Sequence, residues 1–302
     1  MIDLHFHSTF SDGTDTPETI AALGAEKKLT AMALTDHDNT DGCARFAAAA
    51  QSHGIESLTG VELSVKHENV TIHILGYGID TANAALAAKL EWARDARYRR
   101  NAQIFANLSR MGYPLQYGDI MGFVGEDGKA PGRPHIARAL VSKGYMKTTR
   151  KAFEKLLGRG KPAYAERERL TSLEAIALIQ GAGGVAVMAH PGDYRNNDGL
   201  SKSRLREITA ALAAAGLVGI EVWHSSNGQA GPDEYLKLAA DFDLVPTGGS
   251  DYHGISTAPL AIGTAYGSLR VPDESFAALR RKIGNAQCGA SKERGASLPT
   301  CE

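Results

Sequence analysis

The sequence predicts an α/β fold of alternating strands and helices, interrupted once by a helical insertion. Short apolar segments alternate with helical patterns in residues 1–79 and again in residues 163–284. Such alternation at short spacing is typical of parallel βαβ units. Residues 80–162 contain helical patterns but no good strand, and residues 285–302 contain Gly, Ser and Pro without periodicity. We therefore expect a discontinuous α/β domain, a helical insertion that covers its active-site face, and a mobile tail.

The composition is that of an ordinary globular protein. The 302 residues are 43% hydrophobic and 22% charged, which allows one large α/β domain with an insertion. The net charge of −1 at pH 7 argues against a broad basic face for duplex DNA. No apolar run is long enough to span a membrane. The three cysteines show no metal-ligand spacing, which fits a reducing cytoplasm.

The chain opens with a short strand. Ile2, Leu4 and Phe6 alternate with polar residues, a pattern typical of a half-buried strand. Because side chains two residues apart point to the same face, His5 and His7 lie on one side of it. Further helices are expected at residues 17–28 and 41–53, and further strands at residues 31–34, 55–58, 60–65 and 70–76.

The insertion is expected to be helical and basic. Apolar positions from Leu86 to Met111 at helical spacing predict one long helix that ends at Gly112. A second helix is expected from Pro134 to Lys143. Most of the basic side chains are expected to lie on outward, solvated helix faces.

The alternation resumes after the insertion. Helices are expected at residues 172–180, 203–215, 233–241 and 273–284, and strands at residues 184–188, 219–223 and 244–247. A histidine follows each of these strands within a few residues: His190, His224 and His253.

Nine histidines and acids form a candidate metal site, because nearly all lie at or just past the carboxyl ends of predicted strands. In a parallel barrel those ends meet on one face, where active sites are built. Imidazole and carboxylate together suit Zn, Mn or Fe, and a carboxylate can bridge two ions. An isolated His-x-His pair would instead indicate a surface strand with two titratable histidines. The nine candidate ligands are His5, His7, Asp12, His37, Glu62, His73, His190, Asp251 and His253.

The motifs occur in a characteristic order: His5-Phe6-His7, Thr35-Asp36-His37, Glu62, His73, Ala189-His190-Pro191 and Gly249-Ser250-Asp251-Tyr252-His253. This order resembles the PHP (polymerase and histidinol phosphatase) domain over residues 1–79 and about 163–284. The resemblance implies a distorted (β/α)7 barrel, as in the amidohydrolase superfamily. It also implies two or three divalent ions, with Mn favoured and Zn or Fe as alternatives.

The resemblance also implies three ligand sets. One ion would be held by His5, His7, Glu62 and Asp251. A second would use Glu62, His73 and His190, and a third would use Asp12, His37 and His253. Many members of the family have His at the position of Asp12.

Three longer motifs point to a narrower branch. They are Gly132-Arg133-Pro134-His135-Ile136-Ala137-Arg138, Glu221-Val222-Trp223-His224-Ser225 and Gly248-Gly249-Ser250-Asp251-Tyr252-His253-Gly254. They resemble the 3′,5′-nucleoside bisphosphate phosphatases, whose relatives also trim short RNA from the 5′ end. The resemblance implies a small nucleotide or short oligoribonucleotide as the partner.

The expected chemistry is in-line attack of a hydroxide on a phosphate monoester without a covalent enzyme intermediate. Two adjacent cations can lower the pKa of a bridging water and clamp phosphoryl oxygens. His224 is the candidate for protonating the leaving alkoxide; the alternative is an imidazole that is merely hydrogen-bonded beside Trp223. Asp36 is expected to orient an imidazole.

Recognition of a second phosphate requires fixed cations away from the metals. Arg133 and His135 lie in a turn that opens a helix, where backbone N–H groups also favour anions. Ser8 could donate to a phosphoryl oxygen or cap the turn after the first strand. Weaker candidates, which solvated charges would equally explain, are Arg99, Arg100 and Lys161.

Three function classes remain open. The first is a metal-dependent phosphatase that removes the 3′-phosphate of 3′,5′-bisphosphonucleotides such as adenosine 3′,5′-bisphosphate, alone or together with a 5′-to-3′ exonuclease activity on short RNA. The second is a phosphatase for another small ester such as histidinol phosphate, which the basic insertion disfavours. The third is a non-catalytic, metal-stabilised module. The sequence does not determine the oligomeric state.

Overall fold

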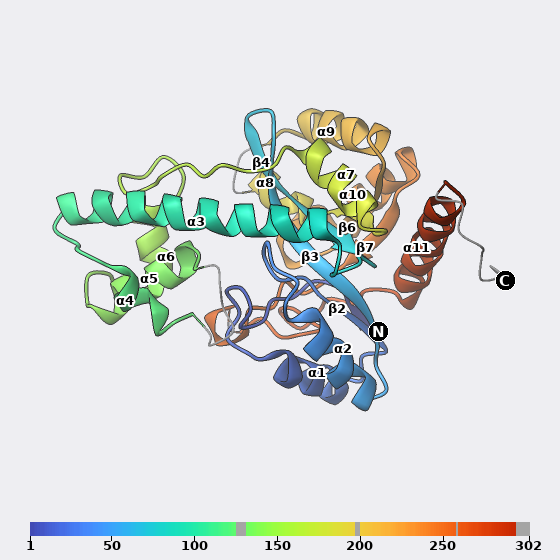
Figure 1. Ribbon diagram of the computed structural model, residues 1–302, viewed down its shortest axis with the longest axis horizontal. Helices are drawn as coiled ribbons and strands as arrows, with labels where there is room; N and C mark the ends of the chain where they lie inside the picture. The colour runs from blue at the N-terminus through green and yellow to red at the C-terminus, as the bar shows by residue number, and fades with distance from the viewer. Residues whose placement is uncertain (125–130, 197–199, 258, 294–302) are drawn as a thin grey trace.

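The computed structural model describes residues 1–124, 131–196, 200–257 and 259–293. It contains one sheet of seven strands in the order β1 to β7, which curls into a nearly closed barrel (Figure 1). The backbone N–H of Leu4 donates to the carbonyl of Gly248, and that of Asp251 to the carbonyl of His5, so the chain after β7 meets the chain after β1. The predicted barrel is confirmed. The strands are β1 (Ile2–Asp3), β2 (Ala31–Leu34), β3 (Glu56–His67), β4 (Val70–Tyr77), β5 (Val185–Met188), β6 (Leu217–Trp223) and β7 (Val245–Gly248).

The strand directions differ from the prediction at one place. β4 is antiparallel to both β3 and β5, whereas the other neighbouring pairs are parallel. The two expected strands at 55–58 and 60–65 form the single long strand β3, which turns back directly into β4. Glu68 in this tight turn adopts a φ of 50°. β3 and β4 therefore form a hairpin in a domain that was expected to consist of parallel βαβ units.

Helices surround the barrel and continue into the insertion. α1 begins at Pro17, and the hydroxyl of Thr16 accepts a hydrogen bond from the N–H of Thr19. No helix in the described part of the chain is both long and apolar enough to cross a membrane. The α-helices are α1 (Pro17–Glu26), α2 (Cys43–Ser52), α3 (Ala84–Arg110), α4 (Tyr117–Met121), α5 (Arg133–Ser142), α6 (Thr149–Ala152), α7 (Ser172–Gly181), α8 (Pro191–Asn196), α9 (Lys202–Ala214), α10 (Gly231–Asp241) and α11 (Asp273–Glu293). A π-helix η1 (Phe153–Leu157) and 3₁₀ helices η2 (Ser225–Ala230) and η3 (Gly254–Thr257) complete the described elements.

α11 is longer than predicted. It continues through Glu293, whereas the sequence predicted a helix only to residue 284. Residues 294–302 of the expected tail lie outside the described part of the chain. Phe276, Leu279 and Ile283 of α11 pack into a buried cluster with Leu4 and Val187 of the barrel. The helix and the insertion lie at opposite ends of the molecule (Figure 1).

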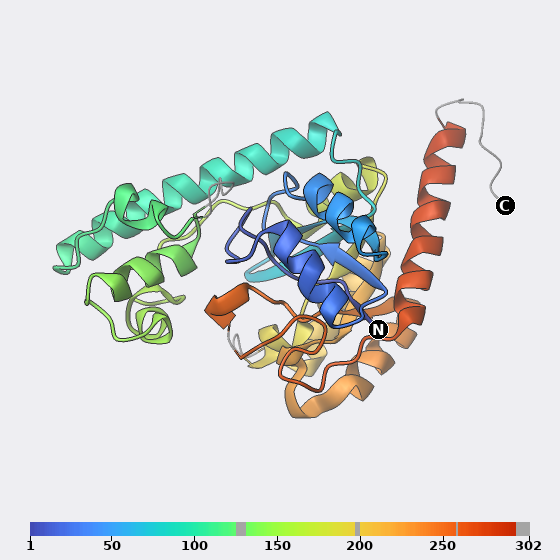
Figure 2. The ribbon, with the colours of Figure 1, turned by 90° about the horizontal axis from the view of Figure 1, so that it is seen from below.

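The insertion has its own apolar core. Leu86 and Leu90, near the start of α3, pack against the barrel strands, whereas Ile104 and Leu108, near its end, pack against α5 and η1. The helix therefore ties the two parts together. Figure 2 shows the insertion helices facing η3 of the barrel across the site described below.

Gly249 allows the end of β7 to approach β1 closely. A Cβ at this position would lie 2.4 Å from the backbone nitrogen of His5. We expect Gly249→Ala to lower the free energy of unfolding by about 2 kcal/mol because the backbone must shift. Urea denaturation followed by circular dichroism would measure it.

Gly284→Ala is the matched control. It lies in α11 with no atom within 4 Å of the added Cβ, so we expect it to stabilise the protein by up to about 1 kcal/mol. Equal effects of the two substitutions would show that the contact with His5 does not constrain the barrel.

Candidate metal centre

The structure brings all nine predicted ligands to one end of the barrel. Most follow the parallel strands at their carboxyl ends. His73 belongs to β4, which runs in the opposite direction, so a residue in its first half reaches the same end. The hairpin that the sequence failed to predict is thus what places this histidine in the cluster.

Glu62 of β3 lies at the centre of the cluster and is 1% exposed. Its Oε1 lies 2.6 Å from His73 Nδ1 and 3.0 Å from His190 Nε2. Its Oε2 lies 2.8 Å from His37 Nδ1 and 3.2 Å from His7 Nε2. His5 Nε2 is 3.5 Å from the same oxygen. One buried carboxylate therefore faces five imidazoles.

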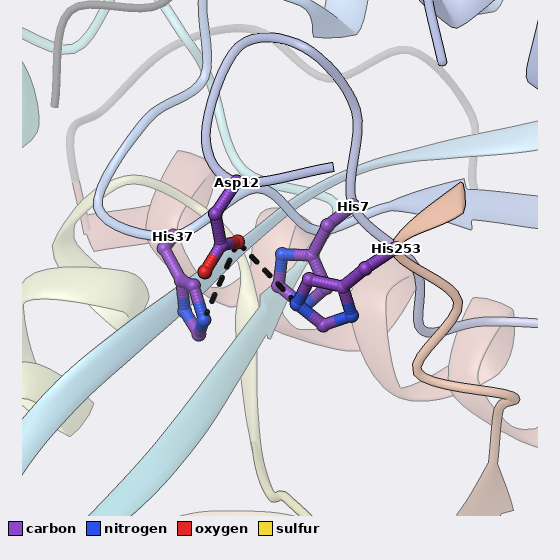
Figure 3. A group of neighbouring side chains, drawn as sticks. All are labelled: His7, Asp12, His37 and His253. Carbon is purple, nitrogen blue, oxygen red and sulfur yellow. Dashed lines mark ion pairs between the residues drawn. The ribbon is translucent and has the colours of Figure 1, made fainter. Parts of the chain in front are cut away.

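Two further carboxylates lie on either side of Glu62. Asp12 Oδ1 lies 3.3 Å from His253 Nε2 and 3.9 Å from His37 Nε2, and the ring of His7 stacks on that of His253 (Figure 3). On the other side, Asp251 Oδ1 lies 3.2 Å from His7 Nε2 and 3.4 Å from His5 Nε2.

The donor atoms fall into four overlapping groups within the described residues, each with its ligand atoms within 4.8 Å of one another. The groups differ from the expected sets in three ways. His7 joins the Asp12 group, and His224 groups with His5 and Asp251. The expected set of Glu62, His73 and His190 is divided, since His190 groups with His5 and Glu62, and His73 with His37 and Glu62. The groups are His7, Asp12, His37 and His253; His5, His224 and Asp251; His5, Glu62 and His190; and His37, Glu62 and His73.

The electrostatics keep the carboxylates ionised. Burial alone would raise the pKa of Glu62, but the charges of His37, His73 and His5 hold it well below its ordinary value. Burial alone would lower the pKa of His7, but hydrogen bonds to Asp251 and Glu62 raise it to about 10. The buried carboxylates thus stabilise positive charge between them. Protons on the imidazoles can supply this charge, and a bound divalent cation would supply it in their place.

The residues fit a metal centre by a second criterion. Asp12 Oδ1, Glu62 Oε2 and His37 Nδ1 are buried, and none takes part in a well-aligned hydrogen bond with the described residues. Buried polar atoms without partners are costly in a native protein. Divalent transition metals bind imidazole nitrogens and carboxylate oxygens, and these are the atoms that face one another here.

The backbone is strained at the same place. Asp251 and Asp38 adopt left-handed φ angles of 56° and 50°, and His190 adopts a φ of 27°. Such conformations are unfavourable for residues other than glycine and concentrate at functional sites. At Asp251 and His190 the residue belongs to the metal cluster, and at Asp38 it holds two arginines of the neighbouring pocket.

Glu221 is a functional residue for which the sequence analysis predicted no role. It is fully buried in β6, and its two oxygens lie 3.1 and 3.2 Å from His5 Nδ1. It also accepts the backbone N–H of His190 at 2.8 Å. The proton on His5 therefore sits on Nδ1, which leaves the Nε2 lone pair for a metal. A lone acid within the apolar strand Gly219-Ile220-Glu221-Val222 was the available signal.

Asp36 and Ser8 lie beneath the cluster rather than in it. Asp36 accepts the hydroxyl of Ser11 at 2.5 Å, and the Ser11 oxygen lies 3.4 Å from His7 Nδ1. Asp36 thus contacts His7 through the Ser11 hydroxyl and belongs to none of the ligand groups. The hydroxyl of Ser8 donates to Asp36 at 2.6 Å, so its proton is not available to a phosphoryl oxygen.

His224 faces the cluster with a defined tautomer. Its Nδ1 accepts the backbone N–H of Ser226 at 3.1 Å, so the neutral ring carries its proton on Nε2. Nε2 lies 3.8 Å from Asp251 Oδ2 and takes part in no hydrogen bond with the described residues. In this tautomer His224 is a hydrogen-bond donor toward the site and not a metal ligand.

A pocket of arginines adjoins the metal cluster. It opens on Asp12, His37 and His73 and is lined by five guanidinium groups from the insertion and the segment after it. Its volume is about 160 Å³. The arginines are Arg97, Arg100, Arg133, Arg167 and Arg169.

Only part of this positive charge is balanced. Arg97 and Arg167 both donate to Asp38 Oδ2, at 2.6 and 2.9 Å. Arg100 is buried, and its Nη2 has no hydrogen-bond partner among the described residues. Burial and the neighbouring guanidinium groups, Arg97 foremost, push the pKa of Arg100 well below its ordinary value. Three carboxylates, Asp12, Asp38 and Glu166, stand against five guanidinium groups, so the pocket keeps an excess of positive charge.

The other predicted cations have different positions. Arg99 is exposed and pairs with Glu168, and the exposed Lys161 lines neither this pocket nor the metal cluster. His135 is buried, and its Nδ1 accepts the N–H of Gly132 at 2.9 Å. Its proton therefore lies on Nε2, which has no partner among the described residues.

Comparison with known proteins agrees with this architecture. The profile of the PHP domain matches residues 3–223. The chain belongs to the PHP domain family.

Relatives in this family extend over most of the chain. A 3′,5′-nucleoside bisphosphate phosphatase from Chromobacterium violaceum is 40% identical over 83% of this chain and 87% of its own length. A 5′-3′ exoribonuclease from Haemophilus influenzae is 33% identical over 83% of this chain and 89% of its own. The solved structure of a proposed metal-dependent phosphoesterase from Bifidobacterium adolescentis superposes with a TM-score of 0.83, at 34% identity, over 94% of this chain and 96% of its own. The predicted family is confirmed, and the predicted enzyme class, a phosphoric ester hydrolase, agrees with these relatives.

We expect Glu221→Gln to lower the affinity for Mn²⁺ about 10–100-fold, because altering the hydrogen-bond partner of a metal-binding imidazole typically changes the metal affinity by that factor. Isothermal titration calorimetry of the purified protein would measure the change. Glu207→Gln, whose side chain is 62% exposed on α9, is the control and should leave the affinity unchanged. Unaltered binding in Glu221→Gln would remove the role assigned to this carboxylate.

Proposed function

We propose that this PHP protein is a metal-dependent phosphatase that removes the 3′-phosphate from 3′,5′-bisphosphonucleotides, converting adenosine 3′,5′-bisphosphate to AMP and phosphate. The observation that carries the proposal is the arginine pocket beside the metal cluster. An ester with a single phosphate would leave the Arg100 and Arg133 guanidinium groups without an anion. A substrate with two phosphates satisfies both sites at once.

The nine predicted ligands would hold two or three divalent ions, for which Mn²⁺ is the favoured choice and Zn²⁺ or Fe²⁺ the alternatives. When bound, such ions lower the pKa of a water and neutralise phosphoryl oxygens. Glu62 would be shared between sites because its two oxygens face different histidines. Glu221 and Ser11 hold His5 and His7 with their Nε2 lone pairs turned inward.

His224 would supply the proton to the leaving 3′-oxygen. Its Nε2–H points at the Asp251 side of the cluster, and its Nδ1 is held by the N–H of Ser226. The ring must be charged to give up a proton, and in that form its Nδ1–H would donate to the Ser226 hydroxyl oxygen, which lies 2.8 Å away. Burial lowers the pKa of His224, which favours release of the Nε2 proton.

The second phosphate would lie in the arginine pocket. Arg133 stands between the rings of Phe153 and Tyr164, at 5.8 and 5.6 Å from their centroids, so its guanidinium has a fixed plane. A guanidinium in a fixed plane binds phosphate oxygens in pairs. The pocket is smaller than the ~300–1,000 Å³ of typical small-molecule sites, which suits a phosphate group rather than a nucleoside.

Hydrolysis of short 5′-phosphorylated RNA is the second candidate activity. The 33% identical exoribonuclease from Haemophilus influenzae favours it. The same arginine pocket would hold the terminal 5′-phosphate, and the metal cluster would cleave the first phosphodiester. Release of mononucleotides from the 5′ end of a labelled RNA would identify this activity.

We expect the purified protein with Mn²⁺ to prefer adenosine 3′,5′-bisphosphate over histidinol phosphate by at least about 100-fold in kcat/KM, because the latter leaves the charged pocket unpaired. Phosphate release measured for both substrates decides the question. Equal rates, or a preference for histidinol phosphate, would overturn the proposed substrate class.

Arg133→Ala should raise KM for the bisphosphate about 10–100-fold, the effect of a lost hydrogen bond between charged groups. The KM for a simple monophosphate ester such as p-nitrophenyl phosphate should change little. Arg99→Ala is the control, since Arg99 pairs with Glu168 outside the pocket. A similar loss for both substrates in Arg133→Ala would argue against a second phosphate site.

A further inference from the structure

A second cavity opens on the other side of Asp12. It lies between the insertion and η3, has a volume of about 480 Å³, and is bounded at its inner end by Asp12 and His253. Asp12, Pro134 and Phe153 line both this cavity and the arginine pocket. A molecule with its phosphate on the arginines can therefore extend past Asp12 into this space.

The walls of the cavity are mainly apolar and come from two parts of the fold. Pro134 and Phe153 belong to the insertion, and Ile255 belongs to η3 on the barrel. Thr149 and Arg138 supply the polar atoms. Figure 2 shows η3 on the barrel side and the insertion helices opposite it.

Phe153 is held in place by its neighbours. It begins the π-helix η1, a local distortion that is frequent at functional sites. The guanidinium of Arg133 packs on its ring, so the ring that borders the arginine pocket also borders the second cavity. The two cavities thus share an ordered aromatic wall.

Ile255 is an exposed aliphatic side chain on a constrained backbone. It is 80% exposed, although its N–H donates to the Thr14 hydroxyl at 2.9 Å. Gly254 before it has a φ of 74°, and a Cβ there would lie 1.9 Å from the Thr14 Oγ1. The fold therefore holds a large apolar side chain out over the cavity instead of burying it.

We propose that this cavity is the nucleobase slot, in which Phe153 and Ile255 form opposite walls around the base of the nucleotide. The inference rests on the proposed function and assigns a binding site to the base, the part of the substrate that neither the metal cluster nor the arginine pocket would contact. Apolar walls attract the faces of any base, whereas Thr149 and Arg138 offer few groups to read its edge. The slot is thus expected to require a base but to select weakly among bases.

Binding of the reaction product tests the slot without relying on catalysis. Calorimetry should show that AMP binds about tenfold or more tightly than ribose 5-phosphate, which lacks the base, because stacking on a side chain is worth that much. Ile255→Ala and Phe153→Leu should each remove most of this difference by weakening AMP alone. Leu173→Ala, at another exposed aliphatic residue, should leave both affinities unchanged.

The outcomes separate the slot from the proposed function. If AMP and ribose 5-phosphate bind equally to the native protein, or if the two substitutions weaken both ligands equally, the cavity is not a base slot. If instead AMP binding follows the prediction while adenosine 3′,5′-bisphosphate is not hydrolysed, the slot stands and the proposed phosphatase activity is wrong. Affinities for AMP, GMP, CMP and UMP that differ by more than about tenfold would contradict the weak selection among bases, since reading a base edge is worth at least that much.

Discussion

The buried carboxylate of Glu62 constrains the whole active end of the barrel. A single ionised carboxylate is expensive to bury unless positive charge surrounds it. Five histidines face this group at 2.6 to 3.5 Å, and they come from the chain after β1, after β2, within β4 and after β5. Keeping those rings in position requires the strand order, the reversed direction of β4 and the left-handed backbone at His190.

A layer of buried polar residues fixes the imidazoles from below. Glu221 holds His5, and Asp36 acts on His7 through Ser11. Because each of these contacts uses Nδ1, both rings present Nε2 to the centre of the cluster. Asp38 performs the equivalent task for the arginines, since it holds Arg97 and Arg167 beside His37. The metal cluster and the arginine pocket are thus organised by two acidic residues of one loop, Asp36 and Asp38, which lie on either side of His37.

The ligands were predictable from the sequence for a local reason. Most of them lie at or just past the end of a short strand pattern, and His5 with His7, like Asp251 with His253, repeats a spacing of two residues. The reversed strand was not predictable in the same way, because the turn at Glu68 carries none of the Gly or Asn-Gly signals of a tight hairpin. His73 reaches the cluster because the antiparallel direction brings the first half of β4 to the active end.

The supporting residues were missed because their partners are distant in the chain. Glu221 is 216 residues from His5, and Asp38 is 59 residues from Arg97 and 129 from Arg167. No periodicity or motif links such pairs, so only the fold reveals them. For Arg99 and Lys161 the sequence predicted a role that the structure does not support. The basic composition of the insertion made them candidates, but neither lines the arginine pocket. Arg99 and Arg100 are neighbours on α3, yet only Arg100 is buried, because the two side chains occupy different faces of the helix.

Diffraction from crystals grown with Mn²⁺, recorded at the manganese absorption edge, would show whether Glu62 lies at the centre of a metal site. We expect anomalous peaks within coordination distance of the Glu62 carboxylate, with the Nε2 atoms of His5 and His7 directed at one of them. Manganese bound elsewhere on the protein at saturating concentration, with none beside Glu62, would contradict this expectation.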